Sequence, residues 1–272
     1  MTTGRPTDPG DMQLRVGGAT DVGRVREHNE DAALAECSVF MVCDGMGGHA
    51  AGEVASAMVV EAVREVACRP SLTVEDLTAQ LREANRRVIA AADADPERQG
   101  MGTTATGIAV VRAAGTDHWA VFNVGDSRVY RFINDELSQV TIDHSEVQEL
   151  IEAGVITPDE ARVHPLRNVV TRSLGVVDAL QVDTWVFPPF AGERFVICSD
   201  GLTNEVSDQD IARILRELDD PQQAAEELVR AAVTHGGRDN VTVIVVALEG
   251  QADDDDSATT PLRTMTDRTT GG

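Results

Sequence analysis

The chain has 272 residues, which suits one large domain or two small ones, and 42% of them are hydrophobic, enough to build a core. Its formal net charge is −23, and all 23 basic residues are arginines because the sequence contains no lysine. This excludes Schiff-base lysine chemistry and a P-loop lysine, and such acidity should repel nucleic acid and anionic lipid.

Hydrophobic periodicity and turn residues divide most of the chain into helices and strands. In chain order the predicted elements are helices 52–68 and 74–92, strands 104–112, 118–124, 127–133 and 136–141, a short helix 145–153, strands 182–187 and 193–199, helices 210–218 and 221–233, and a final strand 241–248. Asn134 and Asp135 form a hairpin turn pair, Ser145 caps the short helix and Gly154 ends it. Paired helices and meandering strands predict an α+β sandwich of antiparallel sheets rather than a doubly wound parallel sheet.

Composition also predicts the domain limits. Residues 1–12 contain two prolines and two glycines and are expected to form a flexible leader, without the apolar core of a signal peptide. No linker or repeat interrupts residues 13–249, which we predict to be one domain. Residues 250–272 are acidic and then Thr-rich, and we expect a disordered tail. No stretch approaches the ~18 apolar residues of a membrane span, so we expect a soluble, cytoplasmic protein. We also expect a monomer.

The four cysteines form no C-x-x-C pair. The four are Cys37, Cys43, Cys68 and Cys198, and three of them lie in or beside apolar runs. We therefore predict buried free thiols in a reducing compartment, and neither disulfides nor zinc ligands.

A glycine-rich turn follows the apolar run of residues 38–43, in the stretch "SVFMVCDGMGGHA". The spacing of Gly45, Gly47 and Ala50 loosely fits a dinucleotide-binding fingerprint. That motif requires an alternating β-α-β scaffold, which the predicted elements do not supply. The aspartate at the end of the run, Asp44, is therefore the more informative residue.

Four aspartates stand at the ends of apolar runs. Asp44 follows "FMVC", Asp126 follows "WAVFNVG", Asp200 follows "FVICS", and Asp239 directly precedes "NVTVIVV". Any one of them could simply terminate a strand through an Asx turn. If the strand ends converge, however, the carboxylates need a compensating charge, and without lysine a divalent cation is the natural one. Carboxylate oxygens favour Mg²⁺ or Mn²⁺ over zinc.

The segment "DVGRVREHNEDAAL" contributes Arg26, Glu30 and Asp31 as further candidate site residues. Arg26 offers paired donors that match phosphate oxygens, although a surface salt bridge with Glu27 or Glu30 is an equally good interpretation. Glu30 and Asp31 could hold metal-bound water.

These motifs, taken in order, resemble those of one known family. They are Arg26-x-x-Asn29-Glu30-Asp31, "VCDGMGGHAAGE", "MGTTAT", "NVGDSRVYR", "DHSEVQELIEAGVITPDEARVHPLRNVVTRSLG", "ICSDGLT" and "GGRDNVTVIVV". Together they resemble the PP2C-type (PPM) metal-dependent protein serine/threonine phosphatases in their bacterial form, over residues 13–248. The resemblance implies a four-layer α-β-β-α sandwich with helix pairs on both sides and a Mn²⁺ or Mg²⁺ centre at one edge.

The resemblance also assigns metal ligands. Asp44 is expected to bridge two ions, and Gly45 to offer its carbonyl oxygen. Asp200 and Asp239 are expected to complete the first ion's ligands. Asp126, together with Asp200, matches the ligands of a third, looser ion.

Further roles follow from the same resemblance. Arg26 matches a phosphate-clamping arginine and Asp31 an acidic residue that holds metal-bound water. Glu30 and Asn240 are expected to support the ligands from behind. His49 is the candidate general acid; a helix-start histidine without a catalytic part is the alternative.

Two positions depart from the family pattern. Met46 stands where eukaryotic relatives carry a histidine after Asp-Gly, so the acid has to come from elsewhere. Residues 143–170 match the flap beside the active site, and Glu146 replaces a tryptophan that many bacterial relatives have there. The exchange puts the packing and the substrate preference of the flap in question.

The implied activity is metal-dependent hydrolysis of phosphoserine and phosphothreonine in proteins, by a hydroxide that bridges two ions. The expected partners are phosphorylated proteins, among them Ser/Thr kinases and their substrates. Two alternatives keep the fold: a catalytically silent binding module, which should have lost metal ligands, and a phosphatase dedicated to one regulatory phosphoprotein such as an anti-sigma-factor antagonist.

Overall fold

The computed structural model describes residues 12–47 and 51–249. The predicted leader up to residue 11, the predicted tail and His49 lie outside the described residues.

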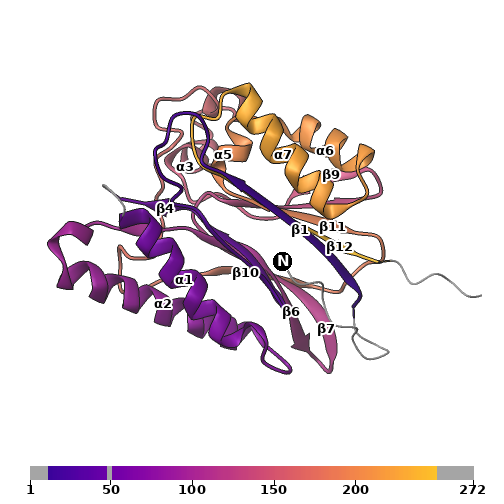
Figure 1. Cartoon of the computed structure of the whole chain (residues 1–272), viewed down its shortest axis with the longest axis horizontal. Coiled ribbons are helices and arrows are strands. Elements are labelled where there is room, and N and C mark those ends of the chain that lie inside the picture. The colour runs from indigo at the N-terminus through magenta and orange to yellow at the C-terminus, as the bar shows by residue number, and fades with distance from the viewer. Residues whose placement is uncertain (1–11, 48–50, 250–272) are drawn as a thin grey trace, which may run out of the picture.

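Two five-stranded antiparallel sheets lie face to face in the middle of the molecule (Figure 1). The first sheet has the order β1 (Leu14–Asp21), β12 (Val241–Leu248), β11 (Arg194–Cys198), β8 (Arg128–Ile133) and β9 (Glu136–Gln139). The second has the order β10 (Asp183–Phe187), β7 (Thr116–Val124), β6 (Ala105–Ala113), β3 (Val39–Cys43) and β2 (Ala32–Glu36). A small two-stranded sheet joins β4 (Gly45–Met46) to β5 (Gly102–Thr103).

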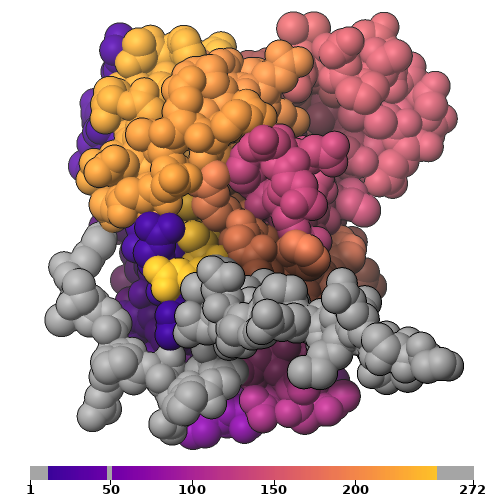
Figure 2. Space-filling model, turned by 90° about the vertical axis from the view of Figure 1, so that its right-hand side faces the viewer, coloured from indigo at the N-terminus to yellow at the C-terminus, as the bar shows by residue number. Residues whose placement is uncertain are grey.

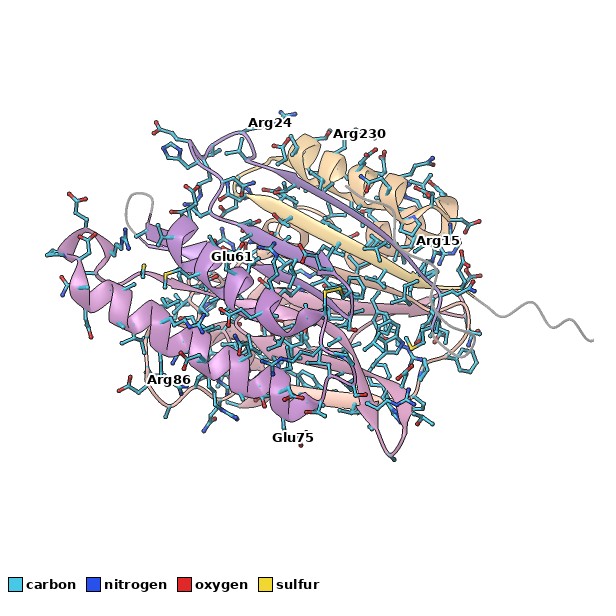
Figure 3. The ribbon with its side chains drawn as sticks, turned by 60° about the horizontal axis from the view of Figure 1, so that its bottom comes forward. Arg15, Arg24, Glu61, Glu75, Arg86 and Arg230 are labelled. Atoms are coloured by element: carbon cyan, nitrogen blue, oxygen red, sulfur yellow. A yellow bond between two sulfur atoms is a disulfide. The ribbon has the colours of Figure 1, made fainter. Side chains whose placement is uncertain are left out.

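Helices cover the outer face of each sheet, so the predicted α-β-β-α sandwich is confirmed. The long helices α1 (Ala51–Ala67) and α2 (Val74–Ala94), followed by the 3₁₀ turn η1 (Pro96–Arg98), pack on the second sheet. The helices α5 (Asp200–Thr203), α6 (Asp208–Glu217) and α7 (Pro221–His235) pack on the first. Two short helices, α3 (Glu146–Glu152) and α4 (Pro158–Ala161), lie between β9 and β10. Charged side chains such as Arg86 on α2 and Arg230 on α7 point outward (Figure 3). Within the described ranges, we find no helix with both the length and the apolar character that a membrane crossing requires.

The central strands are buried on both faces, which is why they read as continuous apolar runs. Phe40 and Val42 of β3 belong to the core between the two sheets. Val39, Met41 and Cys43 of the same strand face the helices α1 and α2. The two-residue alternation of a strand is therefore hidden in the sequence and becomes visible only in the contacts.

The first strand, β1, was not predicted because two glycines interrupt its pattern. It pairs with β12 along its whole length, from Leu14 opposite Leu248 to Asp21 opposite Val241. A Cβ atom on Gly17 would lie 2.2 Å from the backbone nitrogen of Gln222. The missing side chain thus lets α7 approach the sheet. This contact requires glycine, a residue of low strand propensity, in the middle of the strand.

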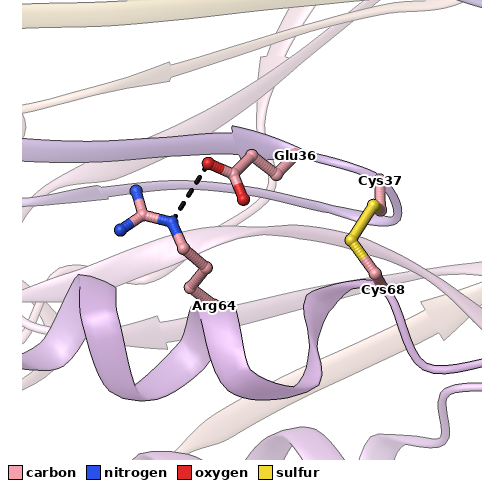
Figure 4. The surroundings of a disulfide bond; sticks show 4 residues. All are labelled: Glu36, Cys37, Arg64 and Cys68. Atoms are coloured by element: carbon pink, nitrogen blue, oxygen red, sulfur yellow. Dashed lines mark hydrogen bonds and ion pairs between the residues drawn. A yellow bond between two sulfur atoms is a disulfide. The ribbon is translucent and has the colours of Figure 1, made fainter.

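The prediction of four free thiols is wrong for one pair. Cys37 and Cys68 form a disulfide with a Cα–Cα distance of 5.2 Å and a sequence separation of 31 (Figure 4). Cys37 occupies the turn between β2 and β3, and Cys68 directly follows α1, so tertiary structure alone brings them together. Cys43 and Cys198 are buried free thiols, as predicted. Burial raises the pKa of Cys198 to about 12, so it stays protonated.

Candidate active site

The four predicted aspartates converge on one edge of the sandwich. β3 and β7 both pair antiparallel with β6, so they run in the same direction and end at the same edge. β11 ends where its antiparallel neighbour β12 begins. Asp44, Asp126, Asp200 and Asp239 follow or precede these four strand ends, and with Arg26 they line one pocket of about 370 Å³. Strand direction therefore places the carboxylates together.

Hydrogen bonds to its backbone hold Asp44 in place. Its N–H donates to Thr104 Oγ1 at 2.8 Å, and the N–H of Thr104 donates back to the Asp44 carbonyl at 2.9 Å. The hydroxyl of Thr103 donates to the same carbonyl at 2.9 Å. A Cβ atom on the next residue, Gly45, would lie 2.3 Å from the Gly52 carbonyl oxygen. Only glycine fits there, because the start of α1 packs directly against it.

Arg26 reaches the pocket through an ion pair that the sequence did not indicate. Its Nη2 atom lies 2.8 Å from Asp239 Oδ2, and the Arg26 side chain is 50% exposed. The hydrogen bond to Asp239 raises the pKa of Arg26, so the guanidinium stays charged. Glu27 does not enter this contact. The surface salt-bridge interpretation of Arg26 thus gives way to a pairing inside the pocket.

Asn240 fastens the segment that carries Arg26 and Glu30. Its side-chain Nδ2 donates to the carbonyls of Val22 and His28, each at 2.9 Å. Its Oδ1 accepts from the N–H of Glu30 at 2.8 Å. Because Asn240 follows Asp239 directly, the loop is tied to the β12 end of the pocket.

Asp31 lies behind the pocket with one oxygen satisfied and one not. The hydroxyl of Ser199 donates to Asp31 Oδ2 at 2.8 Å, and Ser199 in turn accepts the N–H of Thr242 at 3.0 Å. Among the described residues, the buried atoms Asp31 Oδ1 and Glu30 Oε1 have no hydrogen-bond partner. Ser199 was not predicted as a site residue, although it stands directly before Asp200 in "ICSDGLT".

The pocket concentrates negative charge, and the carboxyl groups hold protons more tightly than usual. Burial, reinforced by the charges of Asp200 and Asp239, raises the pKa of Asp31 to about 7. Burial and the charge of Asp200 raise the pKa of Asp126 to about 8. The pKa of Asp44 is also raised well above its ordinary value, first by burial and then by its acidic neighbours. Without a compensating cation these groups cannot all ionise near neutral pH.

The flap closes one side of the pocket. Asn168 and Val170, near its C-terminal end, line the pocket, and Val170 pairs with Ser145 at the other end. The segment after β9 forms a projecting lobe at the upper right of Figure 2. Glu146 begins α3, and its N–H donates to the Val169 carbonyl at 2.9 Å. Glu146 does not line the pocket, whereas Asn168, which was not predicted, does. Only the place of Asn168 in the motif "HPLRNVV" could have indicated it.

The described residues contain no ready-made metal cage. In ranges 12–47 and 51–249, no group of three or more His, Cys, Asp or Glu side chains is arranged to hold a metal ion. The predicted ligands Asp44, Asp126, Asp200 and Asp239 nevertheless share one pocket. Met46 and Gly47 also line it, and the proposed acid His49 lies outside the described residues.

The comparison with protein families gives the chain its class. The family described as "Protein phosphatase 2C" matches residues 24–233. The chain belongs to this family, as its motifs indicated.

Relatives of known structure and name agree with this assignment. The "Serine/threonine phosphatase stp" of Listeria innocua is 37% identical over 238 residues, which are 84% of this chain and 93% of that protein. The crystal structure of the serine/threonine phosphatase PstP/Ppp of Mycobacterium tuberculosis has a TM-score of 0.80 and 37% identity, covering 87% of this chain and 99% of that one. A PstP catalytic domain solved with two manganese ions has a TM-score of 0.79 and 35% identity, with coverage of 87% and 98%.

Proposed function

We propose that this chain is a protein serine/threonine phosphatase that hydrolyses phosphoserine and phosphothreonine in proteins. The observation that carries the proposal is the convergence of four strand-end aspartates and Arg26 in one pocket. Its membership of the protein phosphatase 2C family supports the same reaction. The proposed substrates are phosphorylated proteins, among them Ser/Thr kinases and their targets.

The residues of the pocket fit divalent cations. The side-chain donors are carboxylate oxygens, the ligand type that Mg²⁺ and Mn²⁺ prefer. The raised pKa values of Asp44 and Asp126 and the unpartnered oxygen of Asp31 are expected of carboxyl groups placed to share a cation. We propose that Asp44, the Gly45 carbonyl, Asp200 and Asp239 hold two ions, and that Asp126 with Asp200 holds a third.

When bound, such ions would neutralise the carboxylates and the phosphate and lower the pKa of water. Arg26 would bind the phosphate oxygens through its guanidinium, which requires it to turn from Asp239 toward the substrate. Its half-exposed side chain leaves it free to do so. Asp31 is proposed to hold water at such ions, with its carboxylate fixed by the hydrogen bond from Ser199. We propose His49 as the residue that protonates the leaving alkoxide.

The position of the flap suggests how a protein substrate would be held. Asn168 and Val170 of the flap line the pocket together with Arg26 and Glu30. A phosphorylated side chain would enter between them, and the flanking polypeptide would run along the flap. Glu146 lies outside the pocket lining, so its exchange for the family's tryptophan is proposed to affect the flap's packing rather than the chemistry.

Phosphate release from a phosphothreonine peptide tests the proposal. Metal-stripped protein is assayed with Mn²⁺, Mg²⁺, Ca²⁺ or EDTA, beside Asp239→Asn and the matched surface control Asp135→Asn. We expect turnover with Mn²⁺ that EDTA abolishes, and a loss of at least about 100-fold in Asp239→Asn but not in the control.

Two results would contradict the proposal in different ways. Turnover that survives EDTA and Asp239→Asn would refute the metal site. A folded protein that binds Mn²⁺ but turns over no phosphopeptide would instead favour the catalytically silent binding module.

A further inference from the structure

His144 joins four segments of the chain at the base of the flap. Its side chain is buried, with 8% exposed, between the end of β7 and the start of β10. Its own N–H donates to the Gly125 carbonyl at 2.9 Å, and its carbonyl accepts the N–H of Thr171 at 2.8 Å. The residue thus connects both ends of the flap to the strand end that carries Asp126.

The contacts of the ring define its protonation state. The N–H of Gly125 approaches Nδ1 at 3.0 Å, and an N–H can only donate, so Nδ1 must accept and carries no proton. The proton therefore resides on Nε2, which lies 3.1 Å from Asp183 Oδ2 and donates to it. Burial lowers the pKa of His144, in keeping with a neutral ring. Both nitrogens are thus committed to structural partners in one tautomer.

On one side the imidazole holds the turn that presents Asp126. Gly125 has a φ of +114°, which only glycine adopts readily, and a Cβ atom there would lie 2.5 Å from Thr104 Cγ2. Thr104 is the residue that binds the Asp44 backbone. Gly125 therefore packs between His144 and Thr104, the residue that fixes the backbone of Asp44.

On the other side the imidazole holds the flap. Asp183, the first residue of β10, accepts from His144 and also from Arg172 Nη1 at 2.7 Å. Arg172 lies two residues after Val170, which lines the pocket. Movement of the flap's C-terminal end would therefore be transmitted to Asp183 and to the ring.

We propose that His144 is a positioning residue for the phosphatase reaction, which couples the placement of the flap to the placement of Asp126. The inference rests on the proposed function. Its neutral ring accepts from Gly125 to fix the Asp126 turn, and donates to Asp183 to fix the flap. We call the hydrogen bond with Gly125 the Gly125 arm and the hydrogen bond with Asp183 the Asp183 arm. The Gly125 arm positions the reacting end of the pocket, and the Asp183 arm positions the side where the polypeptide binds.

Two substitutions separate the arms. In His144→Asn the side-chain oxygen lies near the position of Nδ1 and can still accept from Gly125, whereas nothing reaches Asp183. In His144→Gln the longer amide can reach Asp183, but the acceptor beside Gly125 is lost. His118→Gln is the matched control, because His118 lies near the start of β7, at the end of that strand away from Gly125.

Kinetics and two measurements independent of activity test the proposal. We expect His144→Gln to lower kcat by about 10- to 100-fold and to weaken Mn²⁺ binding by calorimetry, as loss of a supporting hydrogen bond does at metal sites. Hydrogen exchange of residues 125–128 should accelerate in this variant. His144→Asn should instead raise KM with little change in kcat, and accelerate exchange in residues 168–172. His118→Gln should match the wild type in all three.

Equal effects of the two variants on kcat, KM and exchange, or no effect of either, would overturn the proposal. If His144→Gln does not fold, Asp183→Asn takes its place beside His144→Asn, and both must raise KM rather than lower kcat. If the wild type has no phosphatase activity, the proposed function fails, while Mn²⁺ affinity and exchange still decide the role of His144.

Discussion

Replacing Asn240 with alanine should destabilise the protein and weaken its metal site together. The side chain makes three hydrogen bonds to the backbone of the loop from Val22 to Glu30, and it is only 5% exposed. Alanine leaves two carbonyls and one N–H without these partners. The loop carries Arg26 and precedes Asp31, so its loosening moves groups on both sides of the pocket.

The magnitude follows from these three bonds. Each intramolecular hydrogen bond contributes about 0.5–1.5 kcal/mol net, and the exposed position of His28 lets water replace part of the loss. We therefore expect the free energy of unfolding to fall by about 2–3 kcal/mol. In a domain of this size, that corresponds to a decrease in Tm of roughly 4–12 °C. Mn²⁺ affinity should fall by about 10- to 100-fold, as for other residues that support metal ligands.

Urea unfolding of the metal-stripped protein and calorimetric titration with Mn²⁺ measure the two effects. Asn134→Gly serves as the control, because Asn134 is an exposed hairpin residue with φ +52° that glycine adopts easily. A variant that loses stability but binds Mn²⁺ as tightly as the wild type would refute the reasoning, since the loop would then be independent of the site. Equal behaviour of Asn240→Ala and the control would refute it as well.

Three further predictions concern other parts of the molecule. Cys37→Ser should lower the free energy of unfolding by about 3–4 kcal/mol, the chain-entropy value for a bridge across 31 residues, and a reducing agent should abolish the difference from the wild type in urea titrations. The pKa values of Asp31 and Asp126 are about 7 and 8 in the folded protein, above the unfolded value near 3.9. Their protonated forms therefore stabilise the folded state at low pH, and this stabilisation is lost as pH rises through 7–8. The Tm of the metal-stripped protein should thus fall between pH 5 and 8, and a flat profile would contradict this. Arg26→Ala should reduce kcat/KM for a phosphopeptide by about 10- to 100-fold through loss of a charge-assisted hydrogen bond, and an unchanged kcat/KM would exclude Arg26 as the phosphate clamp.

Much of the fold could be predicted because helices and buried strands keep a local signal. The prediction of helix 52–68 agrees with α1 within one residue, and strand 241–248 agrees with β12 at both ends. β1 was missed because Gly17 is selected by the approach of α7 and not by strand propensity. The Cys37–Cys68 disulfide was missed because the return of α1 to the β2–β3 turn leaves no mark in the spacing of the cysteines.

The same distinction between local sequence signals and tertiary contacts applies to the residues of the site. The aspartates could be found because each stands at the end of an apolar run, and strand direction then decides which ends meet. Ser199 and Thr104 could not be found in this way, because each acts through a hydrogen bond to a segment distant in sequence, and Asn168 could not because it does not end an apolar run. The roles proposed for the aspartates, for Arg26 and for His49 stay predictions until the variants are measured.

The acidic edge also explains why so many neutral hydrogen bonds surround it. Burying Asp44, Asp126 and Asp200 near one another costs stability in the absence of a cation, as their raised pKa values show. The fold compensates through the backbone, since the turn at Asp44 is fixed by Thr104 and the turn at Asp126 by a neutral histidine. Neutral partners fix these turns without neutralising the carboxylates. The carboxyl groups of Asp44 and Asp126 therefore stay available to cations, while hydrogen bonds to the neighbouring backbone fix the shape of the pocket.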